Sequence, residues 1–295
     1  MQWKADWSLR GRMLLTMVLL GLLYVVFMSV LWVALESIIL VVALLGVFSL
    51  GQLLYSDKLA LRSLGASEVD PSEYPGLHQT VERLAQQADL PKPTVAVAES
   101  KTPNAFATGR SQDSATVCVT TGLLGTLSNE ELEGVLAHEL AHVKNRDVIV
   151  MTIASFLSTI AFLIVRWGWL FSGGGGDGGD DGGGGVGILG AILVSLVVWV
   201  VSFLLIRALS RYREYAADRG AAVITGDPAA LASALETIDS DMQATPSEDL
   251  RDQAEMNAFF IIPIDKGIIG RIASTHPSTE KRIENLRTLQ RELET

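Results

Sequence analysis

The chain has few cysteines, histidines and basic residues, and each shortage excludes a class of protein. Cys118 is the only cysteine among 295 residues, so no disulfide can form within the chain. It lies in an alternating apolar run, where a small core residue is the simplest interpretation. There are 23 Lys and Arg against 33 Asp and Glu, a net charge of −10. Because nucleic-acid-binding proteins carry basic surfaces, we expect no nucleic-acid partner.

Charged residues are absent from four long stretches, each near the roughly 20 residues that a bilayer core requires. Apolar residues make up 49% of the chain, and the mean hydropathy is +0.34. Buried helices of a soluble domain are the alternative, but four such runs rarely occur in one small protein. We therefore predict four transmembrane helices in two hairpins. The predicted spans are Met13–Leu35, Ser37–Tyr55, Val148–Val165 and Val186–Ile206.

Basic residues flank the outer ends of these spans, whereas the loop within each hairpin is acidic or uncharged. Loops rich in Lys and Arg remain in the cytoplasm, so we predict a multi-pass plasma-membrane protein with both termini and its polar parts in the cytoplasm. Arg166 is the one exception. The flanking residues are Lys4, Arg10, Arg12, Lys58, Arg62, Lys144, Arg146, Arg207, Arg211 and Arg213, and the loop residues are Glu36, Asp177, Asp180 and Asp181.

The polar remainder is large enough for one domain, which the second hairpin interrupts. Its pattern predicts an α+β fold, mainly helical with a small sheet. Ser128 and Glu131 form a capping box for a helix that begins near Asn129 and runs into the third span. The predicted regions are an N-terminus (1–12), a first hairpin (13–55), a first domain part (56–147), a second hairpin (148–206, Gly-rich loop 172–187) and a second domain part (207–295). The other predicted elements are helices 73–88, 229–238 and 278–293 and strands 94–98, 104–109 and 115–121.

The sequence His-Glu-Leu-Ala-His at 138–142 is typical of a zinc peptidase. On a helix, positions four apart share a face, so His138 and His142 can bind one metal ion. Glu139 lies beside that face, where a carboxylate can accept a proton from metal-bound water. Catalytic zinc needs a third protein ligand, which two histidines do not provide.

Glu214 is the best candidate for that third ligand. It follows the fourth span at about the distance by which His142 precedes the third, so an antiparallel hairpin would place both at similar heights. Asp218, one turn after Glu214, could accept a hydrogen bond from a ligand histidine, and Asn145 could do related work. The alternative for Glu214 and Asp218 is a pair of solvated helix charges.

Together these motifs resemble the HtpX-type membrane zinc endopeptidases, of the same superfamily as the CAAX prenyl endopeptidases. The resemblance rests on the residues above and on the segments 104–109 (Asn-Ala-Phe-Ala-Thr-Gly) and 275–283 (Thr-His-Pro-Ser-Thr-Glu-Lys-Arg-Ile). It implies a gluzincin fold, one zinc ion per chain, and quality-control proteolysis of misfolded or damaged membrane proteins.

The resemblance also implies roles for residues whose spacing leaves them unassigned. Asn104, Ala105, Phe106 and Ala107 would form an edge strand that binds substrate backbone. His276, with Arg282 nearby, would stabilise the oxyanion. The alternatives are an ordinary turn and strand for the first segment, and a helix-initiating turn at His276 for the second.

Other functional classes remain as alternatives. A scaffold or sensor with an inactive zinc site would retain the ligands, yet Glu139 is intact. A transporter would need ionisable residues inside its spans, where only Arg166 occurs near an end. Prenyl endopeptidases usually have more spans than four. We therefore expect a zinc metalloendopeptidase whose partners are the bilayer and unfolded or membrane-protein substrates, in an oligomeric state that the sequence does not reveal.

Overall fold

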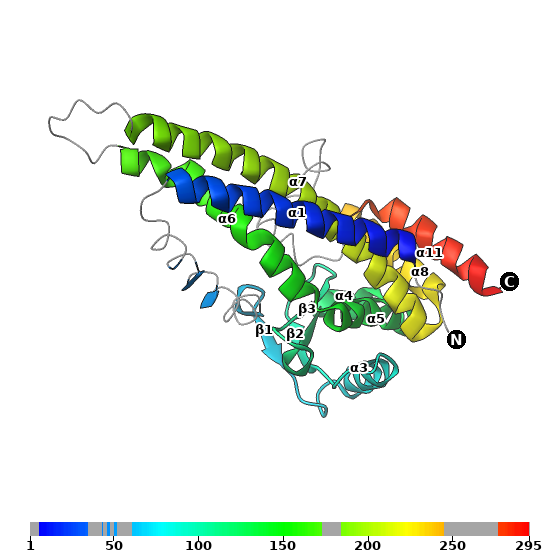
Figure 1. The fold of residues 1–295 in the computed structure, drawn as a ribbon. Helices are drawn as coiled ribbons and strands as arrows, with labels where there is room; N and C mark the ends of the chain where they lie inside the picture. Colours follow the sequence, from blue (N-terminus) through cyan, green and yellow to red (C-terminus); the bar gives the residue numbers. More distant parts are fainter. Residues whose placement is uncertain are drawn as a thin grey trace. The chain divides into compact units, whose positions relative to one another are not determined.

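The computed structural model describes residues 6–34, 61–172, 184–244 and 277–294, with isolated positions between 43 and 51. The chain divides into two compact units. The apolar-helix unit comprises residues 7–54 and 150–209, and the sheet unit comprises residues 1–6, 55–149 and 210–295. Figure 1 shows their elements along the chain.

Three long helices form the described part of the apolar-helix unit: α1 (Trp7–Ala34), α6 (Asp147–Ser172) and α7 (Gly184–Thr225). Each contains a segment long and apolar enough to cross a membrane, namely Trp7–Val30, Asp147–Arg166 and Gly190–Thr225. The described residues thus provide three candidate spans rather than four, and the predicted span 37–55 lies outside them.

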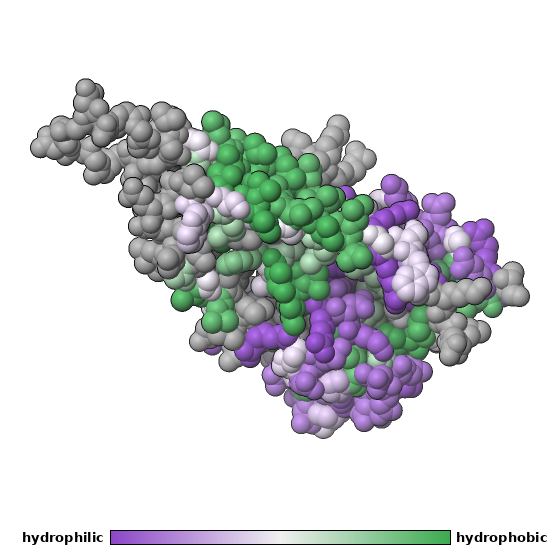
Figure 2. All heavy atoms as spheres, viewed as in Figure 1, coloured by the Kyte–Doolittle hydropathy of each residue, from purple (hydrophilic) through white to green (hydrophobic). Residues whose placement is uncertain are grey.

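The surface of these helices is apolar, as Figure 2 shows in green. Leu14, Val25, Leu193 and Val197 are among the large side chains that point outward. An apolar surface of this size is not stable in water, so it belongs in lipid. Inside the unit, the Tyr24 hydroxyl donates to the Ala154 carbonyl at 2.6 Å, which joins α1 to α6 through a satisfied polar contact.

The described residues of the sheet unit form four strands in the order β1-β2-β4-β3. These are β1 (Ala66–Glu68), β2 (Thr94–Ala98), β3 (Ala105–Thr108) and β4 (Thr116–Thr120). β2 and β4 are parallel, and β3 pairs antiparallel with β4, with Ala107 opposite Val117. The three predicted strands are therefore confirmed, and β1 is an addition. β3 is an edge strand of the described sheet.

The described helices of this unit are α3 (Pro75–Gln87), α4 (Thr121–Thr126), α5 (Asn129–Asn145), α8 (Pro228–Ala244) and α11 (Thr279–Glu294). α4 and α5 contact the sheet, α3 and α8 pack against α5, and α11 packs against α8. The predicted helices 73–88, 229–238 and 278–293 are confirmed, and the second of them continues to Ala244, whereas α4 is an addition. A 3-10 turn covers Gln112–Ser114. Cys118 is fully buried in β4, as expected for a core residue.

The predicted continuous helix from Asn129 into the third span is wrong. α5 ends at Asn145, and Arg146 has left-handed backbone angles (φ 56°, ψ 40°) before α6 begins at Asp147. The Arg146 amide donates to the carbonyls of His142 and Val143, which closes α5. The chain therefore changes direction one residue before Asp147.

Candidate metal centre

Helix α5 carries the two histidines, and its local sequence explains why it forms. The Ser128 hydroxyl accepts the Glu131 amide, while the Glu131 carboxylate accepts the Ser128 amide, so the predicted capping box is present. Residues 134–141 of α5 are buried. At Gly134 a Cβ atom would lie 2.8 Å from the Leu231 backbone nitrogen, so only glycine allows α8 to pack so closely.

A second close approach brings α7 against the histidine motif. A Cβ atom at Gly220 would lie 2.6 Å from the Ala141 Cβ atom, far inside van der Waals contact. Ala141 precedes His142, and Gly220 is six positions after Glu214 on α7. The small residues at this contact therefore allow the third candidate ligand to approach the first two.

The candidate metal ligands His138, His142 and Glu214 converge in the folded chain. The two histidine Nε2 atoms are 3.1 Å apart, and each lies 3.5 Å from one oxygen of the Glu214 carboxylate. One ligand atom from each residue can be chosen so that all lie within 4.8 Å of one another. His138 and Glu214 are buried, and His142 retains 15% of its side-chain surface.

These spacings suit a tetrahedral zinc ion. With metal–ligand bonds of about 2.0–2.2 Å, neighbouring donors of a tetrahedron lie about 3.3–3.5 Å apart. The partly exposed His142 marks the side from which water or substrate can enter. The residues therefore fit the metal that the sequence motif predicts.

The charge around the three ligands also calls for a cation. Glu139, Asp147, Glu214, Asp218 and Arg282 are buried, and Arg213 retains 12% of its side-chain surface. With neutral histidines, these four carboxylates and two guanidinium groups carry a net charge of −2 among the described residues. Such a cluster is costly to bury unless a counter-charge joins it, and one divalent cation is the matching charge.

The pKa of His138 reflects the same charge. Burial and the Arg282 guanidinium oppose protonation of this ring, but the hydrogen bonds that the ring donates to the Asp218 and Glu214 carboxylates outweigh both and raise the pKa to about 9. Metal binding requires the neutral imidazole. A cation in the site would therefore replace the proton that the carboxylates otherwise attract.

Each ligand histidine has its own carboxylate partner behind it. Asp218 Oδ1 lies 3.0 Å from His138 Nδ1, as the spacing predicts for a carboxylate that accepts from a ligand histidine. Asp147 Oδ2 lies 2.5 Å from His142 Nδ1. An Nδ1–H that donates to a carboxylate leaves the Nε2 lone pair for the metal, so both contacts favour the metal-binding tautomer. Asp147 is not among the site residues that the sequence predicts.

Glu139 points toward the edge strand. Its Oε2 atom accepts the Ala107 amide of β3 at 2.8 Å. Burial raises the pKa of this carboxyl group, His138 and His142 lower it, and the net shift is upward. A carboxylate with a raised pKa beside a metal site is suited to accept and return a proton near neutral pH.

The register of β3 shows which of its backbone groups face the open edge. The Thr120 amide donates to the Asn104 carbonyl at 2.9 Å, so this pair is hydrogen-bonded. Hydrogen-bonded and non-bonded pairs alternate in antiparallel strands, so Ala105 and Ala107 direct their backbone groups away from β4. The Ala107 amide bond to Glu139 agrees with that direction. Ala107 is partly exposed, whereas Asn104, Ala105 and Phe106 are buried.

Arg282 links the second ligand helix to α11. Its Nε and Nη2 atoms donate to the two Asp218 oxygens at 3.0 and 2.6 Å, and Nη1 lies 3.5 Å from Glu214 Oε2. The guanidinium group is buried and also lies 3.3–3.4 Å from the His138 ring nitrogens. Arg282 is therefore next to the metal centre, as predicted, and it holds Asp218 toward His138.

Two of the predicted site residues are not part of this cluster as described. Asn145 is exposed at the end of α5. The carboxylates that contact the Nδ1 atoms of His138 and His142 are those of Asp218 and Asp147. His276 lies outside the described residues. The roles predicted for these two residues remain predictions.

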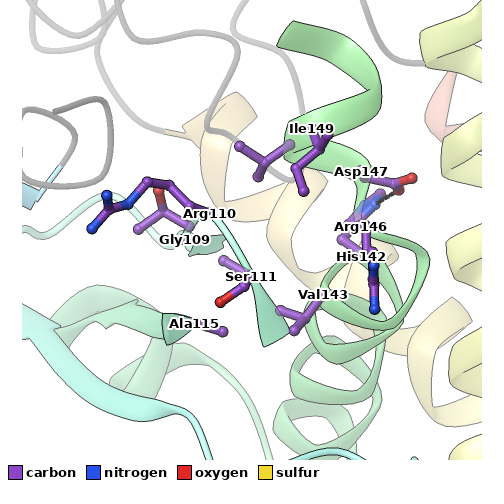
Figure 3. Close-up of a pocket in the computed structure, with 12 residues that line it drawn as sticks. Gly109, Arg110, Ser111, Ala115, His142, Val143, Arg146, Asp147 and Ile149 are labelled. Atoms are coloured by element: carbon purple, nitrogen blue, oxygen red, sulfur yellow. Dashed lines mark hydrogen bonds and ion pairs between the residues drawn. The ribbon is translucent and has the colours of Figure 1, made fainter. Parts of the chain in front are cut away.

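A small, open depression lies beside His142 (Figure 3). Its walls come from the end of β3 and the following turn, and from the junction between α5 and α6. The lining includes Ala107, Ala115, Val143 and Ile149, with Arg110 and Arg146 also contributing. His142 and Asp147 also line it, so the depression combines small and apolar residues with charged or titratable ones.

The known proteins that this chain resembles in sequence are proteases. The model of peptidase family M48 matches residues 71–290. Protease HtpX homolog 2 of Methanosarcina mazei is 55% identical over 295 residues, covering 99% of each chain. Protease HtpX homolog of Moorella thermoacetica is 52% identical, covering 98% of this chain and 97% of its own. The crystal structure of S. mikatae Ste24p has a similar fold, with a TM-score of 0.54 and 19% identity. That match covers 95% of this chain and 66% of the Ste24p chain.

Proposed function

The chain belongs to peptidase family M48 and is a membrane metalloprotease, and we propose that it hydrolyses peptide bonds of misfolded or damaged membrane proteins at the cytoplasmic face, using one zinc ion per chain. The observation that carries the proposal is the convergence of His138, His142 and Glu214 at spacings of 3.1–3.5 Å. A gluzincin-type site, with two histidines on one helix and a glutamate on another, accounts for this set.

The residues of the chain divide the work of hydrolysis among them. Zinc, when bound, polarises the scissile carbonyl and lowers the pKa of water toward about 7. Glu139 accepts the proton of the attacking water and returns it to the leaving amine. Arg282 and His276 are the proposed oxyanion stabilisers, which typically contribute about 10²–10³-fold to the rate.

The edge of β3 is the proposed substrate-binding strand. An extended peptide would add along this edge at the partly exposed Ala107, which gives affinity with little sequence preference. Because the Ala107 amide also holds Glu139, the strand that binds the substrate positions the base as well.

The test uses detergent-purified protein and a glutamine substitution that preserves the shape of Glu139. Glu139→Gln should bind about one zinc ion per chain yet lose about 10²–10⁴-fold in casein cleavage. Glu133→Gln is the control, because Glu133 lies on the same helix in an exposed ion pair with Arg83. Wild-type cleavage by Glu139→Gln, or no zinc in the wild type, would refute the proposal. Zinc in all three without cleavage would favour a metal-stabilised scaffold.

Substrate class and orientation need separate tests. Cleavage of one unfolded sequence, soluble or tethered to the same vesicles, measures the preference for membrane substrates, and equal rates would remove it. For orientation, Asp113→Cys places a thiol on an exposed turn, while native Cys118 is buried and adds little background. Impermeant maleimide should label Asp113→Cys in inverted vesicles and not in right-side-out vesicles, and the opposite pattern would reverse the proposed topology.

A further inference from the structure

Asp147 makes two contacts that join different parts of the metal centre. Its Oδ2 atom lies 2.5 Å from His142 Nδ1, and its Oδ1 atom lies 3.0 Å from Arg213 Nε. Asp147 is 3% exposed, so water does little to screen these contacts. Figure 3 shows Asp147 beside His142 at the start of α6.

The backbone places Asp147 where a regular helix would not. Five positions along a continuous helix correspond to a rotation of about 140° away from the starting residue, so Asp147 would not face His142. The left-handed conformation of Arg146 ends α5 and brings Asp147 back toward the histidine. A non-glycine residue in this conformation is strained, and the fold nevertheless keeps Arg146 in it.

The second contact reaches the helix that carries the third ligand. Arg213 immediately precedes Glu214 on α7, and its side chain is largely buried. Asp147 therefore connects His142, at the end of α5, to the residue next to Glu214. The Asp147 carboxylate thus contacts the ring of His142 and the side chain of the residue that precedes Glu214.

We propose that Asp147 and Arg213 are positioning residues that set the orientation of His142 and the approach of Glu214 to the metal. This inference rests on the proposed metal site. The Asp147 carboxylate holds the Nδ1–H of His142, so that Nε2 faces the metal. Arg213 in turn fixes the Asp147 carboxylate and draws the Glu214 segment of α7 toward α5.

The experiment measures zinc affinity by chelator competition on the full-length protein in detergent, for Asp147→Ala, Asp147→Asn, Arg213→Gln and the double variant Asp147→Ala/Arg213→Gln. Loss of an outer carboxylate typically costs 10–100-fold in metal affinity, and we expect that range for Asp147→Ala. Asp147→Asn retains an acceptor oxygen for Nδ1–H, so it should recover part of the loss. Because the two residues act as one unit, the double variant should lose less than the product of the single losses.

Cobalt substitution separates positioning from general stabilisation. If Asp147 orients His142, the visible absorption bands of the cobalt-loaded Asp147→Ala protein should differ from those of the wild type, and those of Asp147→Asn should differ less. Glu133→Gln, in an exposed ion pair elsewhere on α5, should change neither affinity nor spectrum.

The outcomes distinguish this inference from the proposed function. Wild-type zinc affinity and cobalt spectra in Asp147→Ala, with only a lower melting temperature, would show a structural ion pair and overturn the inference. A fold loss of zinc affinity in the double variant equal to the product of the two single losses would overturn the coupling through Arg213. Absence of zinc binding by the wild type would instead overturn the metal site on which the inference rests.

Discussion

Replacement of Gly220 by alanine tests how closely α7 must approach α5 for the metal centre to form. The added Cβ atom would lie 2.6 Å from the Ala141 Cβ atom, whereas carbon atoms in contact are about 3.5–4.0 Å apart. The two helices must therefore separate locally by roughly 1 Å. Zinc–ligand distances tolerate only about 0.2 Å, so Glu214 would no longer reach the histidines without strain.

Two opposing effects set the expected stability of Gly220→Ala. Overpacking a core contact costs about 1–3 kcal/mol, and replacing glycine by alanine inside a helix returns about 1 kcal/mol. The net change in unfolding free energy is therefore a loss of about 0–2 kcal/mol. Because the displacement lies beside the ligands, we expect zinc affinity to fall by at least about 10-fold. The effect of Gly220→Ala on zinc binding should therefore be larger than its effect on the stability of the fold.

The assay compares Gly220→Ala with Gly76→Ala, since a Cβ atom at Gly76 of α3 meets nothing within 4 Å. Gly76→Ala should melt at or above the wild-type temperature and bind zinc normally. Gly220→Ala should bind zinc weakly in chelator competition. If Gly220→Ala instead bound zinc like the wild type and melted as Gly76→Ala does, the close approach of the helices would not limit the site.

Two further predictions concern the sheet unit. The Glu131 carboxylate caps α5 and also accepts hydrogen bonds from the Ser233 and Thr237 hydroxyls. Burial raises the pKa of Glu131, but these hydrogen bonds lower it more, so that the pKa lies below its ordinary value of 4.5. The stabilisation that the Glu131 carboxylate gives is therefore full above about pH 4.5 and is lost as the pH falls through the lowered pKa. Glu131→Gln should lower the unfolding free energy by about 1–2 kcal/mol at pH 7 and by progressively less in acid. A loss in thermal melts that does not depend on pH would contradict this prediction. Burial raises the pKa of the Cys118 thiol to about 12, so it should resist a disulfide reagent in the native protein and react after denaturation; rapid native labelling would show that β4 opens readily.

The sequence predicts the elements of the sheet unit well, because their signals are local. The capping box at Ser128 and Glu131, the alternating strands and the amphipathic helix 279–294 each depend on neighbouring residues. β1 was missed because three residues carry too little pattern to distinguish a strand from a loop. The second predicted span cannot be compared, since residues 37–55 lie mostly outside the described chain.

Within the metal centre, the spacing between residues decides what sequence reasoning finds. His138 and His142 share a helix face, and Glu214 and Asp218 share another, so periodicity alone groups each pair. Asp147 escapes this reasoning because the left-handed backbone at Arg146 breaks the period. Gly220 escapes it because a helical glycine gives no indication of which neighbour it approaches.

Burial explains why the alternative of solvated helix charges does not describe the second pair. From the sequence, Glu214 and Asp218 among arginines look like an exposed charged helix. In the fold both carboxylates are buried, and Arg282, from 64 positions beyond Asp218, supplies the bidentate partner. Where buried carboxylates outnumber the guanidinium groups that pair with them, a further positive charge must complete the cluster. The same charges that would be unremarkable on a surface thus become, through contacts distant in sequence, a site suited to a divalent cation.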